Sequence, residues 1–203
     1  MQSVKDKVFK RIRGSGRGCV FSARRFLDLG SEGSVRKALE TLTDRGSIRR
    51  LATGVYDYPR QHPQLGPLTP APETIAMAIV GRDSAKLQPS GAYAANLLGL
   101  SLHVPAQIEF LTDGTSRKIH VGKQTIVLRK TVPRTMATAG TVSGLVIQAL
   151  RYLGRANVDD SVIAILNRRL NDQDIRTLLT DIPLAPAWIQ KIIRGLAQAR
   201  GAS

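Results

Sequence analysis

The chain has 203 residues, 42% of them hydrophobic and 4% aromatic, and carries a net charge of +15 from 30 Lys+Arg against 15 Asp+Glu. This length accommodates one domain or two modest ones, and a core built mainly from aliphatic side chains. A single cysteine, Cys19, excludes an internal disulfide framework and a cysteine-rich zinc site. No apolar run is long enough for a membrane span and the first residues lack the apolar core of a secretory signal, so we expect a cytoplasmic protein without a membrane partner.

The positive charge is concentrated near the N-terminus. Residues 1–60 contain 14 basic and six acidic residues, a net charge of +8. Basic surface gathered in one segment favours a polyanionic partner, because binding releases condensed counterions.

The first thirty residues predict two helices around a short strand. Apolar residues at 4, 8, 9 and 12 mark one face of a helix over 3–13, which the loop GSGRG (14–18) ends. CVF (19–21) is typical of a short strand. Ser22 occupies an N-cap position ahead of a brief helix that Gly30 closes.

A third helix and a basic hairpin follow. SEGS (31–34) is a helix start, an apolar stripe runs through Val35, Ala38, Leu39 and Leu42, and Gly46 is a C-cap. Residues 48–51 and 55–58 predict two strands joined around Ala52-Thr53-Gly54.

This order of elements is that of a winged helix-turn-helix. Its third helix points Ser34, Arg36, Lys37, Glu40 and Thr41 outward, and the hairpin places Arg49 and Arg50 beside it. A helix fits the major groove of B-DNA, and arginines on a wing bind flanking phosphates. Residues 1–58 are therefore predicted to be a DNA-binding domain.

A proline-rich stretch separates this domain from a second one. Residues 59–72 contain five prolines and predict a semi-rigid connector. In residues 73–203 we expect helices over 73–81 and 90–100, the latter with Ala94, Leu97 and Leu98 inward. Strands over 108–114, 117–122 and 124–131 and four helices from Thr141 onward complete an α+β protein whose C-terminal domain is mixed α/β with a helical tail.

Motifs of catalysis are weak throughout. GSGRG lacks the glycine and Lys-Ser/Thr positions of nucleotide-binding loops, and His62, His103 and His120 have no metal-ligand spacing. Glu109 and Asp113 lack a third acid with which to hold a cation. We therefore predict no enzyme, no catalytic residue, no metal site and no cofactor.

The stretch SVRKALETLTDRGSIRRLATGVYDYP (34–59) resembles the winged-helix segment of the AbiEi-type antitoxins, abortive-infection regulators of type IV toxin–antitoxin systems. LQPSGAYAANLLGL (87–100) and VPAQIEFLTDGTSRKIHVGKQTIVLRKT (104–131) resemble the central region of their short relatives of roughly 200 residues. The order of segments agrees as well, to about Leu153.

The resemblance implies a transcriptional autorepressor that binds inverted repeats in its own promoter. It also implies an antitoxin that counteracts a nucleotidyltransferase-like toxin encoded next door, without necessarily forming a stable complex. The reading helix would be Ser34–Arg45, with Ser34, Arg36 and Lys37 at bases. Arg49, Arg50 and Thr53 would lie on the wing, and Arg24 and Arg25 near the DNA backbone.

An alternative stays open. The chain is also consistent with a winged-helix regulator whose C-terminal domain senses a ligand or dimerises, with no toxin partner. The neighbouring gene separates the two hypotheses, since a nucleotidyltransferase favours the first and a metabolic or transport operon the second.

Overall fold

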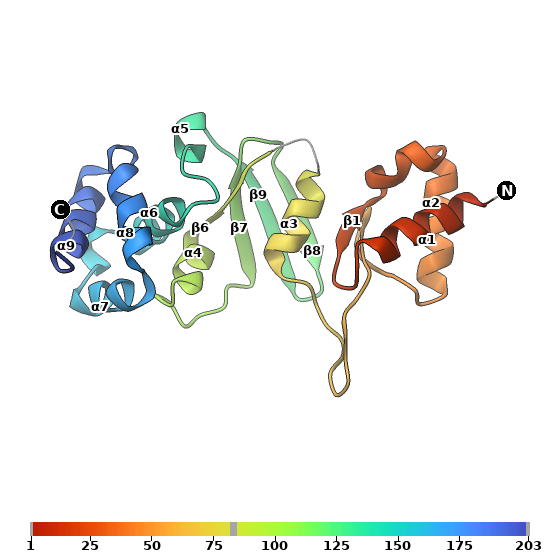
Figure 1. Cartoon of the computed structure of the whole chain (residues 1–203), viewed down its shortest axis with the longest axis horizontal. Helices are drawn as coiled ribbons and strands as arrows, with labels where there is room; N and C mark the ends of the chain where they lie inside the picture. The colour runs from red at the N-terminus through yellow and green to blue at the C-terminus, as the bar shows by residue number, and fades with distance from the viewer. Residues whose placement is uncertain (1, 82–84, 202–203) are drawn as a thin grey trace. The chain divides into compact units, whose positions relative to one another are not determined.

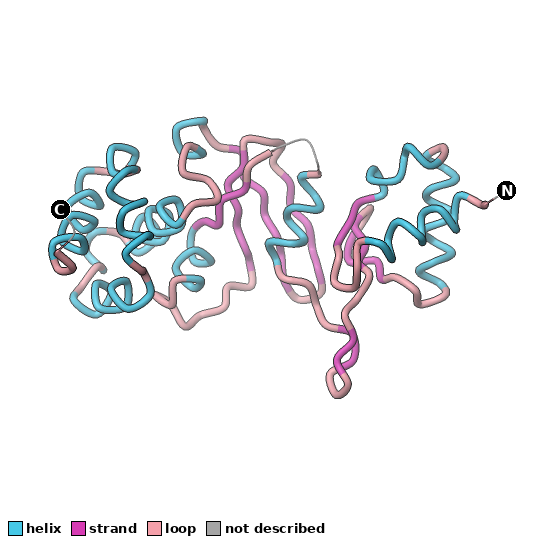
Figure 2. Tube along the Cα trace, viewed as in Figure 1, coloured by secondary structure: helices cyan, strands magenta, loops and turns pink. Residues whose placement is uncertain are grey.

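The computed structural model describes residues 2–81 and 85–201 and has an α+β architecture, with helices and three small sheets (Figures 1 and 2). The chain divides into two compact units. The N-terminal unit comprises residues 1–84 and 119–122, and the C-terminal unit comprises residues 85–118 and 123–203.

The N-terminal unit begins with the helices and strands that the sequence predicts. A three-stranded antiparallel sheet has the order β1-β3-β2. The second helix is a 3₁₀ helix, and Ser22 makes no capping hydrogen bond there. In chain order the elements are α1 (Val4–Gly14), β1 (Val20–Ser22), η1 (Ala23–Leu29), α2 (Glu32–Asp44), β2 (Arg49–Ala52) and β3 (Val55–Asp57).

The core of this unit joins the two α-helices to one face of the sheet. Each helix buries a stripe of residues three or four apart, as an amphipathic helix does when its apolar face is removed from water. From the sheet and η1, Phe21 packs edge-on against Phe26 and stacks on Tyr56 at 6.2 Å. The buried members are Val8, Ile12, Phe21, Phe26, Val35, Ala38, Leu39, Leu42, Ile48 and Tyr56.

Residues 59–72, predicted as a plain connector, contain a second hairpin. Strands β4 (Gln61–His62) and β5 (Gly66–Pro67) pair antiparallel around a three-residue turn. Gly66 has a φ of 70°, a left-handed conformation that glycine adopts without strain. Helix α3 (Pro72–Val80) follows within the N-terminal unit and packs against β1 and β3.

A four-stranded sheet has the order β6-β7-β9-β8, and its strands β6, β7 and β9 lie in the C-terminal unit. Strand β6 pairs antiparallel with β7, and β7 pairs parallel with β9. The three predicted strands are found, whereas β6, which contains a proline, was not predicted. The strands are β6 (Leu87–Ser90), β7 (Gln107–Thr112), β8 (Arg117–Val121) and β9 (Gln124–Lys130).

Helices pack around a second core at the end of the chain. Asp159 caps α7 through the Val162 N–H, and Asn171 and Asp174 form a capping box on α8. In α4 the expectation for Leu97 was wrong, because it is 40% exposed while Leu98 is buried. The helices are α4 (Gly91–Leu97), α5 (Pro133–Met136), α6 (Val142–Leu153), η2 (Arg155–Asn157), α7 (Asp160–Arg169), α8 (Asp172–Thr180), η3 (Ile182–Leu184) and α9 (Ala187–Gln198).

Within the described ranges no helix combines the length and apolar character needed to cross a membrane. Over the same ranges, no three His, Cys, Asp or Glu side chains gather where they would hold a metal ion.

Candidate nucleic-acid interface

Helix α2 presents a polar face opposite its buried stripe. The helix begins at Glu32, two residues before the predicted Ser34, because the Ser31 side chain accepts from the Ser34 N–H at 3.3 Å. Ser34, Arg36 and Lys37 are all exposed in its first turns. These are the turns from which a helix lying in a major groove reaches base edges.

The side chains on this face differ in whether their polar groups already have partners within the protein. Arg36 lies 3.9 Å from Glu40 in an exposed i,i+4 pair, an arrangement that contributes little in water. Thr41 is half-buried and its hydroxyl donates to the Lys37 carbonyl at 2.8 Å, so its polar group is satisfied within the helix. The Ser34 hydroxyl lies 2.9 Å from that of Ser31. In the described part of the chain, Lys37 is assigned no ion pair.

The β2–β3 hairpin carries Arg50 and Thr53 at its surface. Both are exposed, and Thr53 lies in the turn beside Gly54, whose φ is 73°. As with Lys37, no ion pair is found for Arg50 among the residues described. Arg50 is therefore available to an external anion.

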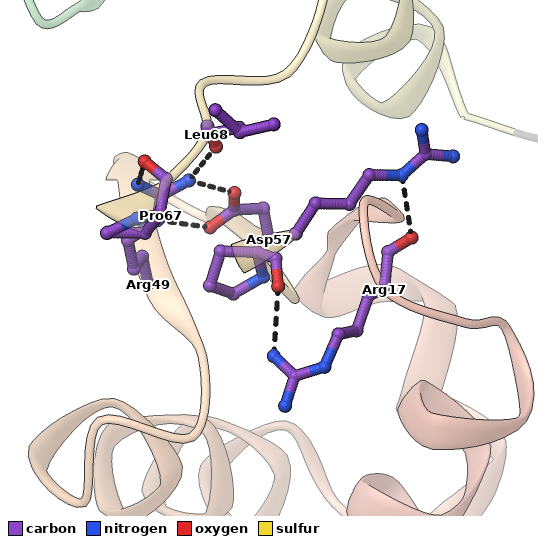
Figure 3. A network of polar contacts seen from close by, with 7 residues as sticks. Arg17, Arg49, Asp57, Pro67 and Leu68 are labelled. Carbon is purple, nitrogen blue, oxygen red and sulfur yellow. Dashed lines mark hydrogen bonds and ion pairs between the residues drawn. The ribbon is translucent and has the colours of Figure 1, made fainter. Parts of the chain in front are cut away.

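Arg49, which was expected to reach DNA from the wing, makes several hydrogen bonds within the fold. Its Nε and Nη2 donate to the Asp57 carboxylate at 3.1 and 2.6 Å. The carbonyls of Pro67 and Leu68 accept from Nη1 and Nη2 at 3.2 and 2.6 Å (Figure 3). The Asp57 side chain is 1% exposed, so an unpaired carboxylate there would be costly.

Strand alternation explains why the two adjacent arginines differ. Arg49 pairs with Asp57 and Arg50 with Tyr56, and successive residues of a strand point to opposite faces. Tyr56 and its cross-strand partner Phe21 share the face that packs against α1 and α2, so Arg49 and Asp57 lie on the other face.

Arg24 and Arg25, predicted near the DNA backbone, lie on η1. Arg24 is exposed, whereas Arg25 is half-buried and donates through Nη2 to the Ser15 hydroxyl at 2.7 Å. Arg11 holds the same helix to α1 through two hydrogen bonds to Asp28 of 2.6 and 2.7 Å. Of the two predicted residues, Arg24 is the freer for an anion.

Two further arginines, which sequence analysis did not select as site residues, join the GSGRG loop to the segment after β3. Arg17 lies over the Tyr58 ring at 4.8 Å and donates to the Pro59 carbonyl at 3.1 Å. Arg60 donates through Nε to the Arg17 carbonyl at 3.3 Å (Figure 3). A Cβ on Gly18 would lie 2.6 Å from Arg60 Nε, so the close approach of the Arg60 side chain favours glycine at this position. The loop is thus a docking surface for Arg60 within the unit.

Residues considered for catalysis have structural partners. Glu109 pairs with Arg129 at 2.6 Å, and Asp113 accepts from the Lys86 N–H at 2.8 Å. Burial raises the pKa of the Cys19 thiol, which opposes formation of a nucleophilic thiolate.

A basic helix-and-hairpin surface on an α+β fold is thus the main candidate site. The chain belongs to a family of unknown function, DUF6088, whose model matches residues 7–178. The match includes parts of both compact units and ends within α8. No curated protein matches the chain.

Proposed function

We propose that residues 1–58 form a winged helix-turn-helix that binds duplex DNA. Helix α2 would enter the major groove, and the β2–β3 hairpin would act as the wing. The observation that carries this proposal is the exposure of Arg36 and Lys37 on the first turns of α2, in the part of the chain with a net charge of +8.

The proposed contacts follow from the geometry of individual side chains. Lys37 and Arg36 would contact base edges, with Ser34 close to them. Arg50, Thr53 and Arg24 would bind phosphates. Arg49, Arg25 and Thr41 are left out because their polar groups are engaged within the protein.

We further propose that the chain is a transcriptional autorepressor and antitoxin of a type IV toxin–antitoxin operon. The C-terminal unit would neutralise a nucleotidyltransferase-like toxin, with or without a stable complex. This part is supported by the resemblance of residues 34–59, 87–100 and 104–131 to AbiEi-type antitoxins.

Two experiments test the two halves separately. Retention of a labelled duplex from upstream of the chain's own gene tests DNA binding, with an unrelated duplex of equal length as control. Rescue of cells from the neighbouring gene's toxicity by residues 59–203 tests the antitoxin half, with folding of the fragment checked by circular dichroism. Rescue by the full chain but not by the folded fragment would contradict the assignment of neutralisation to the C-terminal unit.

A regulator without a toxin partner is the second candidate. The exposed apolar side chains of Leu102 and Val104, 98% and 66% exposed, are compatible with a C-terminal unit that dimerises. A monomeric full-length chain that rescues cells from toxicity would decide against it.

A further inference from the structure

The β4–β5 hairpin extends away from the rest of the N-terminal unit (Figures 1 and 2). Leu65 is 73% exposed, in the turn Pro63-Gln64-Leu65. Two-stranded hairpins are at best marginally stable alone in water, so this one needs support from its surroundings.

The base of the hairpin has that support from two sides. Arg49 binds the carbonyls of Pro67 and Leu68 while its other donors bind Asp57 on β3. On the opposite strand, Arg60 donates to the Arg17 carbonyl and accepts from the Leu68 N–H at 2.8 Å. The hairpin is therefore fastened to the sheet that carries Arg50, whereas its turn makes no such contact with the sheet in the part of the chain that the structure describes.

The tip has the chemistry of a group that enters a DNA groove. Residues 58–72 contain no acidic residue, and Gln64 in the turn and Gln61 on β4 supply amides. His62 Nδ1 accepts from the Gln64 and Leu65 N–H groups, both at 3.2 Å, which orients the imidazole and leaves Nε2 as its donor. Apolar side chains such as leucine act as wedges between base steps when the side chains around them bind the minor groove.

We infer that the β4–β5 hairpin is a second DNA-contacting arm, which inserts Leu65 into the minor groove and bends the duplex. The inference rests on the proposed DNA binding by α2 and β2–β3. The amide and imidazole N–H donors of the hairpin would favour A·T steps. In the minor groove an A·T pair presents only acceptors, whereas a G·C pair adds a donor. An arm tied to the wing by Arg49 would keep a fixed register relative to the reading helix.

The test measures binding and bending on the same molecules. Full-length protein is titrated into an A·T-rich duplex of about 30 base pairs carrying a donor and an acceptor dye at its ends, at low salt. Anisotropy reports affinity, and energy transfer at saturation reports the end-to-end distance. The variants are Leu65→Ala, Leu65→Met, which keeps a bulky apolar wedge, and Val132→Ala, which trims an exposed apolar side chain of the C-terminal unit.

The wild type, Leu65→Met and Val132→Ala are expected to increase energy transfer at saturation. Leu65→Ala is expected to bind within about tenfold of wild-type affinity, because the lost contact is offset by the unstacking it no longer causes, and to leave the duplex straight. If the wild type binds but Leu65→Ala bends the duplex equally, or nothing bends it, the arm is not a wedge and only this inference fails. If the wild type does not bind duplex DNA at all, the proposed function fails and takes the inference with it.

Discussion

Arg49 and Asp57 face each other across β2 and β3, and the arginine bridges this carboxylate to the base of the β4–β5 hairpin (Figure 3). The Arg49 side chain thus neutralises the buried Asp57 carboxylate and also holds the base of the β4–β5 hairpin. Removing one partner of such a pair leaves the other uncompensated.

Replacing Arg49 with alanine is therefore expected to destabilise the N-terminal unit by roughly 2–4 kcal/mol, through lost charged hydrogen bonds and a stranded Asp57 carboxylate. Urea unfolding followed by far-UV circular dichroism measures this loss. Arg50→Ala, the matched control one residue along, should stay within about 0.5 kcal/mol of wild type. Equal stability of the two variants would show that the ion pair does not support the fold.

Arg50→Ala, which should leave stability almost unchanged, is expected to weaken DNA binding. We expect weaker binding to duplexes of any sequence and a slope of log affinity against log salt reduced by about 1, because a phosphate contact is lost. Fluorescence anisotropy over a salt series measures both quantities. An unchanged slope would remove Arg50 from the phosphate contacts.

Lys37→Ala tests base reading by α2. The loss is expected to be about 1–3 kcal/mol on the cognate duplex and much smaller on random DNA, because base contacts are specific to sequence. Lys191→Ala, which removes an exposed lysine on α9, is the charge-matched control. Equal losses on both duplexes would make Lys37 a phosphate contact instead.

Gly144 is expected to be irreplaceable in the C-terminal unit. A Cβ at this position of α6 would fall well inside van der Waals distance of the Gln88 side-chain oxygen and the Thr138 carbonyl. Gln88 is buried and accepts from the Gly140 N–H at 3.1 Å, so it has little room to move.

Gly144→Ala should therefore cost about 1–3 kcal/mol, as overpacking does. Gly195→Ala, with nothing within 4 Å of its Cβ in α9, should instead stabilise by about 0.4–1 kcal/mol. Fluorescence of Trp188, which packs against the same core, reports the unfolding of both variants. Wild-type stability of Gly144→Ala would mean that Gln88 and the backbone near Thr138 can move to make room for the methyl group.

Asp159 gives the C-terminal unit a defined pH response. Hydrogen bonds from the Ser161 hydroxyl and then the Val162 N–H lower the pKa of this carboxyl below 3.8. The carboxylate therefore stabilises the folded state above its ordinary pKa, and this contribution is lost as the pH falls through the lowered value.

Asp159→Asn keeps a capping side chain but removes the titration. The stability difference between wild type and Asp159→Asn should be present at pH 7 and shrink on acidification, as measured by urea unfolding across pH. A difference that stays constant with pH would assign the effect to something other than the carboxylate's charge.

The sequence predicted those elements whose burial has a regular period. In α2 the apolar spacing and the Ser31–Ser34 start were both visible, and the helix was placed within two or three residues. The β4–β5 hairpin was missed because its strands have two residues each and no apolar alternation, so prolines dominated the interpretation. Its order comes from Arg17, Arg49 and Arg60, whose contacts join distant parts of the chain.

For the candidate site, the sequence predicted which elements form the surface but not the partners of each side chain. That Arg36 and Lys37 face outward follows from the helical stripe alone. The different orientations of Arg49 and Arg50 also follow from strand alternation, and Asp57 on the neighbouring strand was the signal for an ion pair. The role of Arg60 had no sequence signal, because it depends on the approach of Gly18.

The most direct test of the central claim is the affinity of the full-length chain for duplex DNA as a function of salt. The proposed interface predicts binding at about 50 mM salt that weakens linearly in log–log form, with a slope set by several phosphate contacts. It also predicts tighter binding to the duplex from upstream of the chain's own gene than to a random duplex of the same length. Absence of binding at low salt, with the protein folded by circular dichroism, would contradict the account.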